Sequence, residues 1–135
     1  MAITLNELVG MTPELEEKLK EAGITNSDQL LEAAKTPKQR QALAQRCGVS
    51  ARDILELANR ADLARIKGIG SAYSNLLEKA GVDTVKELAT RRPDNLHKKI
   101  EEINGKERLV KQTPTQSQVE NWVEQAKQLP KVLEY

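Results

Sequence analysis

Apolar positions along the chain recur at helical spacing, and glycines follow them where a helix would end. Two stripes have the spacing of one buried helix face: Leu15, Leu19 and Ala22 in the first, and Tyr73, Leu76, Leu77 and Ala80 in the second. Gly23 and Gly81 come directly after these stripes, and an apolar residue follows each of them. This is the pattern of a helix that stops on a left-handed residue. The sequence therefore predicts an all-α fold.

The same signals occur twice along the chain. A shift of 58 positions places residues 8–31 on residues 66–89, so that Gly10 meets Gly68 and Ala22-Gly23 meets Ala80-Gly81. The likeness fades and returns between residues 51–63 and 116–129, once an insertion of about seven residues is allowed. We therefore expect two related units, residues 1–60 and residues 61–135.

Capping residues predict where the helices begin. Threonines followed by Pro or by a Glu or Gln three residues on have the pattern of an N-cap, at Thr4, Thr12, Thr36, Thr84 and Thr115. Residues 50–66 contain no Gly or Pro and keep helical spacing, so the last helix of the first unit should run into the second. We expect rigid coupling of the two units, with residues 104–116 as the loosest segment.

Composition narrows the class of protein. The chain of 135 residues has no Phe, so its core must come from Leu, Ile, Val and Ala, which suits helices. Lys and Arg number 21 against 20 Asp and Glu, a balance that argues against a strongly basic nucleic-acid binder. Cys47 is the only cysteine, and no run of about 20 apolar residues occurs. We expect a cytoplasmic protein that does not enter a membrane.

Residues near the second glycine pair resemble a helix-hairpin-helix motif. The residues that carry the resemblance are Leu63, Ile66, Gly68, Ile69, Gly70, Leu77, Ala80 and Gly81. The whole chain resembles an uncharacterised bacterial family of tandem helix-hairpin-helix proteins, one of the domains of unknown function. That resemblance implies two five-helix units, each like a SAM domain and each with one hairpin. It implies no established activity.

In helix-hairpin-helix proteins, backbone amides of the hairpin bind DNA phosphates without reading the sequence. A helix N-terminus offers unpaired N–H groups and the positive end of the helix dipole. The resemblance places such contacts at Gly68, Ile69, Gly70 and Ser71, with charge from Arg65 and Lys67. It also implies a possible monovalent cation on the carbonyls of Ala64, Ile66 and Ile69. Four basic residues, Arg91, Arg92, Lys98 and Lys99, could extend this surface or belong to a mixed solvated face, since Glu101 and Glu102 follow.

The two hairpins differ from each other. The first lacks the second glycine, and the helix after it carries four glutamates, Glu14, Glu16, Glu17 and Glu21. We expect the first hairpin to be structural, because those charges repel phosphate. In the second hairpin, no Lys or Arg occurs in residues 71–74. The alternative for Gly68-Ile69-Gly70 is a tight helix connector with Ile69 in the core.

No residue pattern indicates catalysis. The carboxylates are spread along helix faces, and no Ser/His/Asp set, phosphate-binding glycine loop or zinc signature occurs. His97 has no Cys or His at ligand spacing, and Trp122 lies on an apolar stripe, so we expect neither a metal nor a cofactor, and a core role for Trp122. Two functions stay open: weak, sequence-independent nucleic-acid binding by the second hairpin, or a protein-interaction scaffold in which both hairpins are structural.

Overall fold

The computed structural model of this chain describes residues 2–135, and these residues form helices. In chain order they are η1 (Leu5–Glu7, a 3₁₀ helix), α1 (Pro13–Glu21), α2 (Ser27–Ala33), α3 (Pro37–Cys47), α4 (Ala51–Leu63), α5 (Ser71–Lys79), α6 (Val85–Leu88), α7 (Pro93–Glu107) and α8 (Gln116–Gln128). An isolated antiparallel bridge joins Thr4 and Asn26, and no strand occurs within the described residues. The all-α prediction is confirmed.

Side-chain caps fix the helix starts that the sequence predicts. Thr12 Oγ1 accepts a hydrogen bond from the Leu15 N–H at 3.2 Å, with Pro13 at the first helical position. Thr4, Thr36 and Thr115 each form a reciprocal capping box with the Glu or Gln three residues on. Thr84 accepts a bond from the Glu87 N–H at 3.2 Å, and the Glu87 carboxylate lies 4.0 Å from Arg91 instead of returning the bond.

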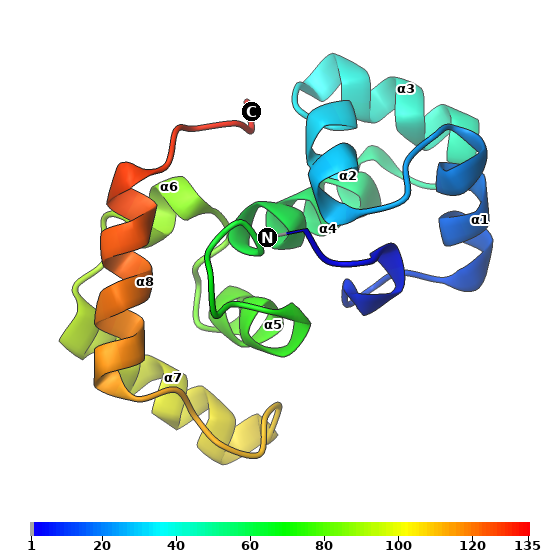
Figure 1. The fold of residues 1–135 in the computed structure, drawn as a ribbon. Coiled ribbons are helices and arrows are strands. Elements are labelled where there is room, and N and C mark those ends of the chain that lie inside the picture. Colours follow the sequence, from blue (N-terminus) through cyan, green and yellow to red (C-terminus); the bar gives the residue numbers. More distant parts are fainter. Residues whose placement is uncertain (1) are drawn as a thin grey trace.

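Helix α4 lies between two hydrophobic clusters. The first cluster contains buried residues of η1 and α1–α3 and includes Ile54 to Ala61 of α4. The second begins at Leu63, the last residue of α4, and continues to Ala126 of α8. In Figure 1, α4 crosses the middle of the molecule, with α1–α3 on one side and α5–α8 on the other. One unbroken helix therefore serves both cores.

Backbone hydrogen bonds recur at the 58-residue spacing. The Ile24 N–H donates to the Leu19 carbonyl at 2.9 Å, and the Val82 N–H donates to the Leu77 carbonyl at 2.9 Å. Helices α1 and α5 have nine residues each and begin 58 positions apart. Helices α4 and α8 have thirteen residues each and begin 65 positions apart, because α7 is longer than α3 and a longer connection follows it.

Besides the continuous backbone of α4, side-chain and backbone contacts connect the two halves. Arg60 of α4 reaches Glu78 of α5, with Nη2 3.2 Å from Oε2. The segment after α8 turns back toward α2 and α3 (Figure 1) and places Leu133 in the first cluster. There the Glu134 carbonyl accepts a bond from Arg40 at 2.6 Å, and the Glu134 N–H donates to the Lys35 carbonyl at 2.9 Å. The chain thus returns to the half in which it began.

The segment 104–116, which the sequence predicts to be the loosest, makes several hydrogen bonds, both within itself and with the rest of the chain. Helix α7 continues through Gly105 to Glu107, so part of this segment is helical. The Asn104 side chain exchanges two hydrogen bonds with the Val110 backbone, at 3.0 and 2.9 Å. The Tyr73 hydroxyl donates to the Gln112 carbonyl at 3.2 Å. No helix of the described residues has the length and apolar character needed to cross a membrane.

Gly81 should resist substitution. Its φ is +91°, a left-handed conformation that a Cβ disfavours, although an added Cβ would meet only Arg91 Nη1, at 4.0 Å. We expect Gly81→Ala to lower the free energy of unfolding by about 1 kcal/mol. Gly105→Ala, inside α7 with open space around it, should instead raise it by up to about 1 kcal/mol. Urea denaturation of both variants tests this, and equal effects would contradict it.

Glu78 should make stability depend on pH. Burial raises the pKa of the Glu78 carboxyl above its ordinary 4.5, and Arg60 opposes this rise in part. Glu78 Oε2 is buried and meets Arg60 Nη2 at 3.2 Å without the geometry of a hydrogen bond, and Arg60 Nε is buried without a hydrogen-bond partner. Since the folded state holds this proton more tightly, its contribution to stability is present below pH 4.5 and is lost as the pH rises through the folded pKa.

The comparison of wild type with Glu78→Gln isolates this effect. The wild type should lose free energy of unfolding relative to Glu78→Gln as the pH rises from about 4. Denaturant titrations at several pH values measure the difference. A difference that stays constant with pH would show that Glu78 has the same pKa in the folded and unfolded chains.

Candidate nucleic-acid interface

The second hairpin exposes its tip and buries one side chain. Lys67 and Gly68 are exposed, whereas Ile69 is 3% exposed and belongs to the second cluster. The Ile69 N–H donates to the Ile66 carbonyl at 3.1 Å, which closes the turn. Gly70 is the N-cap residue of α5. Ile69 therefore anchors the hairpin as a connector would, while the tip on either side of it faces solvent.

Gly68 is required by packing as well as by conformation. Its φ is +96°, and an added Cβ would lie 3.0 Å from Nε1 of Trp122 in α8. Trp122 is 2% exposed, and its ring packs against that of Tyr73 with centroids 5.3 Å apart. The expected core role of Trp122 is thus what the structure shows, and this ring holds α8 against the hairpin.

Gln125 of α8 holds the tip in place. Its Oε1 accepts a hydrogen bond from the Lys67 N–H at 3.0 Å, and its Nε2 donates to the Lys67 carbonyl at 3.1 Å. Nε2 also lies 2.7 Å from Asn121 Oδ1. The Lys67 amide is therefore not available to a phosphate. Gln125 was not predicted from the sequence. The 65-residue offset between α4 and α8 could have indicated it, because this offset pairs Gln125 with Arg60, which lies beside Gly10 of the first hairpin.

The N-terminus of α5 has no side-chain cap. Gly70 offers no side chain, and the first bond of this turn is the one from the Ser74 N–H to the Gly70 carbonyl, at 2.9 Å. A Cβ on Gly70 would meet nothing within 4 Å, so the space beside this N-cap residue is open. At the equivalent end of α1, Thr12 supplies a cap. The first-turn N–H groups of α5, from Ser71 on, are the ones that an anion can approach.

The positive charge at this hairpin comes from Lys67. Lys67 is exposed and forms no ion pair within the described residues. Arg65 is held inside the molecule, with Nη1 2.9 Å from Asp62 Oδ1 and Nη2 2.8 Å from the Pro130 carbonyl. Its side chain is 13% exposed. The geometry therefore does not present Arg65 to a phosphate, in contrast to the sequence-based expectation.

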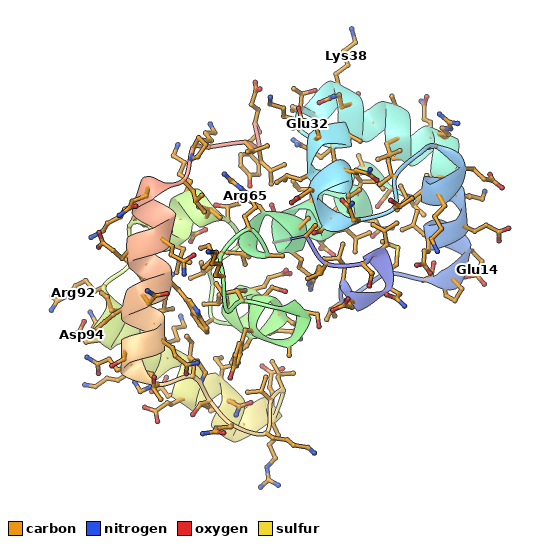
Figure 2. The ribbon with its side chains drawn as sticks, viewed as in Figure 1. Glu14, Glu32, Lys38, Arg65, Arg92 and Asp94 are labelled. Carbon is orange, nitrogen blue, oxygen red and sulfur yellow. The ribbon has the colours of Figure 1, made fainter. Side chains whose placement is uncertain are left out.

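The expected basic flank does not form one surface with Arg65. Arg91 lies 4.0 Å from Glu87, and Arg92 lies 3.3 Å from Asp94. Figure 2 shows Arg92 and Asp94 at the outer edge of the molecule, away from Arg65 near its centre. Lys98 and Lys99 are exposed on α7. They add positive charge to this half, but Glu101 and Glu102 are exposed beside them.

The first hairpin has the same backbone and different chemistry. Gly10 has φ +99°, close to that of Gly68. Val9 occupies the position equivalent to Lys67 and is 39% exposed. Glu14 and Glu16 lie in the first turn of α1, where Glu14 points into solvent in Figure 2. An apolar tip and an acidic helix start make this end a poor site for phosphate.

Metal-binding groups are sparse. Among residues 2–135, no three His, Cys, Asp or Glu side chains lie close enough to hold a metal ion. Of the three carbonyls suggested for a monovalent cation, those of Ala64, Ile66 and Ile69, that of Ile66 accepts the Ile69 N–H. His97 Nε2 lies 3.0 Å from the Pro114 carbonyl. Burial raises the pKa of the Cys47 thiol, which keeps it protonated.

One family model matches the chain. Its description is "Domain of unknown function (DUF4332)", and it matches residues 9–129. The match includes both hairpin tips and helices α1–α8, and it ends before the segment that returns to the first cluster. The comparisons with curated proteins and with solved structures found no match.

Removing the Gln125 side chain should loosen the hairpin tip. Gln125→Ala deletes both hydrogen bonds to the Lys67 backbone, so we expect the free energy of unfolding to fall by about 1 kcal/mol. Gln128→Ala, an exposed residue of the same helix, should change it by less than about 0.5 kcal/mol. Amide hydrogen exchange should accelerate at Lys67 in the first variant alone. Unchanged exchange at Lys67 would contradict the role given to Gln125.

Proposed function

This chain belongs to the DUF4332 family, and we propose that it is a tandem helix-hairpin-helix module that binds the phosphate backbone of nucleic acids weakly, without reading sequence. The observation that carries the proposal is the open, uncapped N-terminus of α5 beside the exposed side chain of Lys67. N–H groups at a helix end and one mobile cation are suited to a phosphate and carry no base-reading contact. On this proposal the protein is a binding module and not an enzyme.

We propose that the two units resemble SAM domains and meet at residue 60. Hydrogen bonds and helix starts that recur at 58 positions support this division. The first unit would contain η1 and α1–α4, and the second would contain the end of α4 with α5–α8. Each unit then has five helical segments, because the end of α4 in the second unit occupies the position of η1 in the first. The contacts of Arg60 and Leu133 support rigid coupling.

The proposed binding is weak because little charge is available. Lys67 is the basic residue that the structure leaves exposed at the tip, and the net charge of the whole chain is +1. We expect a Kd of about micromolar or weaker at physiological salt, typical of non-specific contacts. With Lys67 as the cation at the tip, we expect about one to two phosphates to be neutralised, fewer than if Arg65 also took part, which gives a shallow dependence on salt. The buried Cys47 suits a reducing compartment, and we place the protein in the cytoplasm.

The alternative is a scaffold that binds a protein partner, with both hairpins structural. Such surfaces commonly expose a broad apolar patch. Among residues 2–135, the exposed large apolar side chains are those of Val9 and Tyr135. Two side chains supply little apolar area, which favours the nucleic-acid proposal. Val9 lies at the tip of the first hairpin, so a protein partner would be expected there and not at Lys67.

A matched pair of substitutions separates the two hairpins. Lys67→Gln and Val9→Glu each lower the net charge by one, at equivalent positions of the two tips. We expect Lys67→Gln to weaken binding of a fluorescent DNA duplex and to reduce the salt slope by about one. Val9→Glu should leave both unchanged within the error of the titration. Fluorescence anisotropy at low and moderate salt measures both quantities.

A third variant tests the helix end itself. Gly70→Ser places a hydroxyl where Thr12 caps α1, so it should occupy an N–H group of α5 and weaken binding without lowering stability. No binding by the wild type at low salt would leave the scaffold as the better proposal. Equal losses in Lys67→Gln and Val9→Glu would mean that charge acts from a distance and that the second hairpin is not the site.

A further inference from the structure

A pocket of about 230 Å³ lies where four parts of the chain meet. The end of α4, helix α6, the end of α8 and the segment 131–135 all contribute to it. Its apolar lining consists of Val85, Ala89, Ala126, Leu129, Val132 and Leu133. The residues of the second hairpin tip, 67–71, are not among its lining, so this pocket is separate from the proposed phosphate site.

Three lysines in the lining of this pocket have no carboxylate partner among the described residues. Lys86, Lys127 and Lys131 line it, are exposed, and form no ion pair within the part of the chain that the structure describes. They come from three different elements: α6, α8 and the C-terminal segment. Three separate elements thus each contribute one lysine to the lining of this pocket.

The carboxylate that lines the pocket is already engaged. Asp62 lines the pocket but is 3% exposed, and its carboxylate accepts bonds from Arg65 at 2.9 Å and from the Val85 N–H at 2.8 Å. Asp83 and Glu87 lie outside the lining. Burial raises the pKa of the Tyr135 hydroxyl, and the negative charges of Asp62, Asp83 and Glu87 add to this rise. Glu87 in turn lies 4.0 Å from Arg91. The lining thus keeps a positive excess.

We propose that this pocket binds a small amphiphilic anion, a hydrocarbon chain of about eight carbons that ends in a carboxylate. The apolar walls favour an apolar body, because burial removes it from water. The three lysines, which are exposed, favour a ligand with a negative head group. Since a water-sized group takes up about 30 Å³, the volume holds roughly eight such groups. The pocket is smaller than the roughly 300–1,000 Å³ of sites for drug-sized ligands, which favours a single short chain over a folded peptide.

A ligand here would touch both halves of the molecule. The segment 131–135 forms one wall, and its Leu133 also belongs to the first cluster, whereas Val85 and Ala126 belong to the second. Binding should therefore stabilise the return of the C-terminal segment across α4. Because the ligand binds the folded chain alone, the melting temperature should rise with its concentration.

Calorimetric titration with sodium octanoate at low salt tests the proposal. We expect saturable binding of one octanoate per chain, and a thermal shift that grows with its concentration. The triple variant Lys86→Gln, Lys127→Gln, Lys131→Gln should weaken binding about tenfold, a few-fold for each exposed charge pair lost. The matched control Lys38→Gln, Lys98→Gln, Lys106→Gln has the same net charge, changes exposed lysines elsewhere, and should bind within about twofold of wild type.

Two further arms test the walls and the head group. Ala89→Phe, at the residue that follows α6, fills the pocket and should abolish binding, with far-ultraviolet circular dichroism as the check on folding. Octanol, which lacks the charge, should bind at least about tenfold more weakly than octanoate. The proposal is overturned if octanoate gives no saturable heat, or if the two triple variants weaken octanoate binding equally. It is also overturned if octanol binds as tightly as octanoate, or if folded Ala89→Phe still binds octanoate. Should Ala89→Phe fail to fold, the two lysine triples decide. An acidic tetrapeptide that binds where octanoate does not would also overturn the small-ligand assignment.

Discussion

Helix α4 contributes residues to both hydrophobic clusters, and this is the constraint on which the rest of the structure depends. In the first half, the Ser27 N–H at the start of α2 donates to the backbone carbonyl of Ile3, at 2.9 Å. At the equivalent place in the second half the preceding chain is already the last turn of helix α4, and the Val85 N–H binds a side chain instead of a backbone carbonyl. The side chain of Asp62 takes over, accepting the Val85 N–H at 2.8 Å. A buried carboxylate needs a partner, and Arg65 supplies it.

The use of the Asp62 carboxylate in place of a backbone carbonyl has consequences at the second hairpin. Because Arg65 balances Asp62, it is lost to the solvent-facing surface, and Lys67 is left as the cation at the tip. The 65-residue offset of α4 and α8 shows how the two halves then diverge. Leu57 packs against Gly10 in the first half, and Trp122 packs against Gly68 at the equivalent position in the second. Arg60 and Gln125 likewise occupy equivalent positions beside the two hairpins. The shared backbone carries an apolar, acidic hairpin in one half and an open, basic one in the other.

Local signals predicted the helices, whereas contacts between distant residues could not be predicted. The N-caps at Thr12, Thr36 and Thr115 and the stop at Gly81 depend on neighbours within four residues, so the sequence pattern suffices for them. The engagement of Arg65 depends on Pro130, and Leu133 reaches the first cluster from the end of the chain. Neither contact leaves a periodic trace in the sequence. The sequence therefore predicted the turn between α4 and α5, but it overestimated the charge exposed there, because Arg65 is bound to Asp62 and Pro130.

The account stands on the claim that the second hairpin, and not the first, meets phosphate. The most direct measurement is a nitrogen-15 amide spectrum of the full chain, titrated with a short DNA duplex at low salt. The account predicts shifts that grow with DNA at Ser71 and Ala72 of the α5 N-terminus and at Gly68, with residues 9–12 unmoved. The Lys67 amide, held by Gln125, should shift less than that of Ser71. Shifts of equal size at both hairpins, or at residues 9–12 alone, would contradict it.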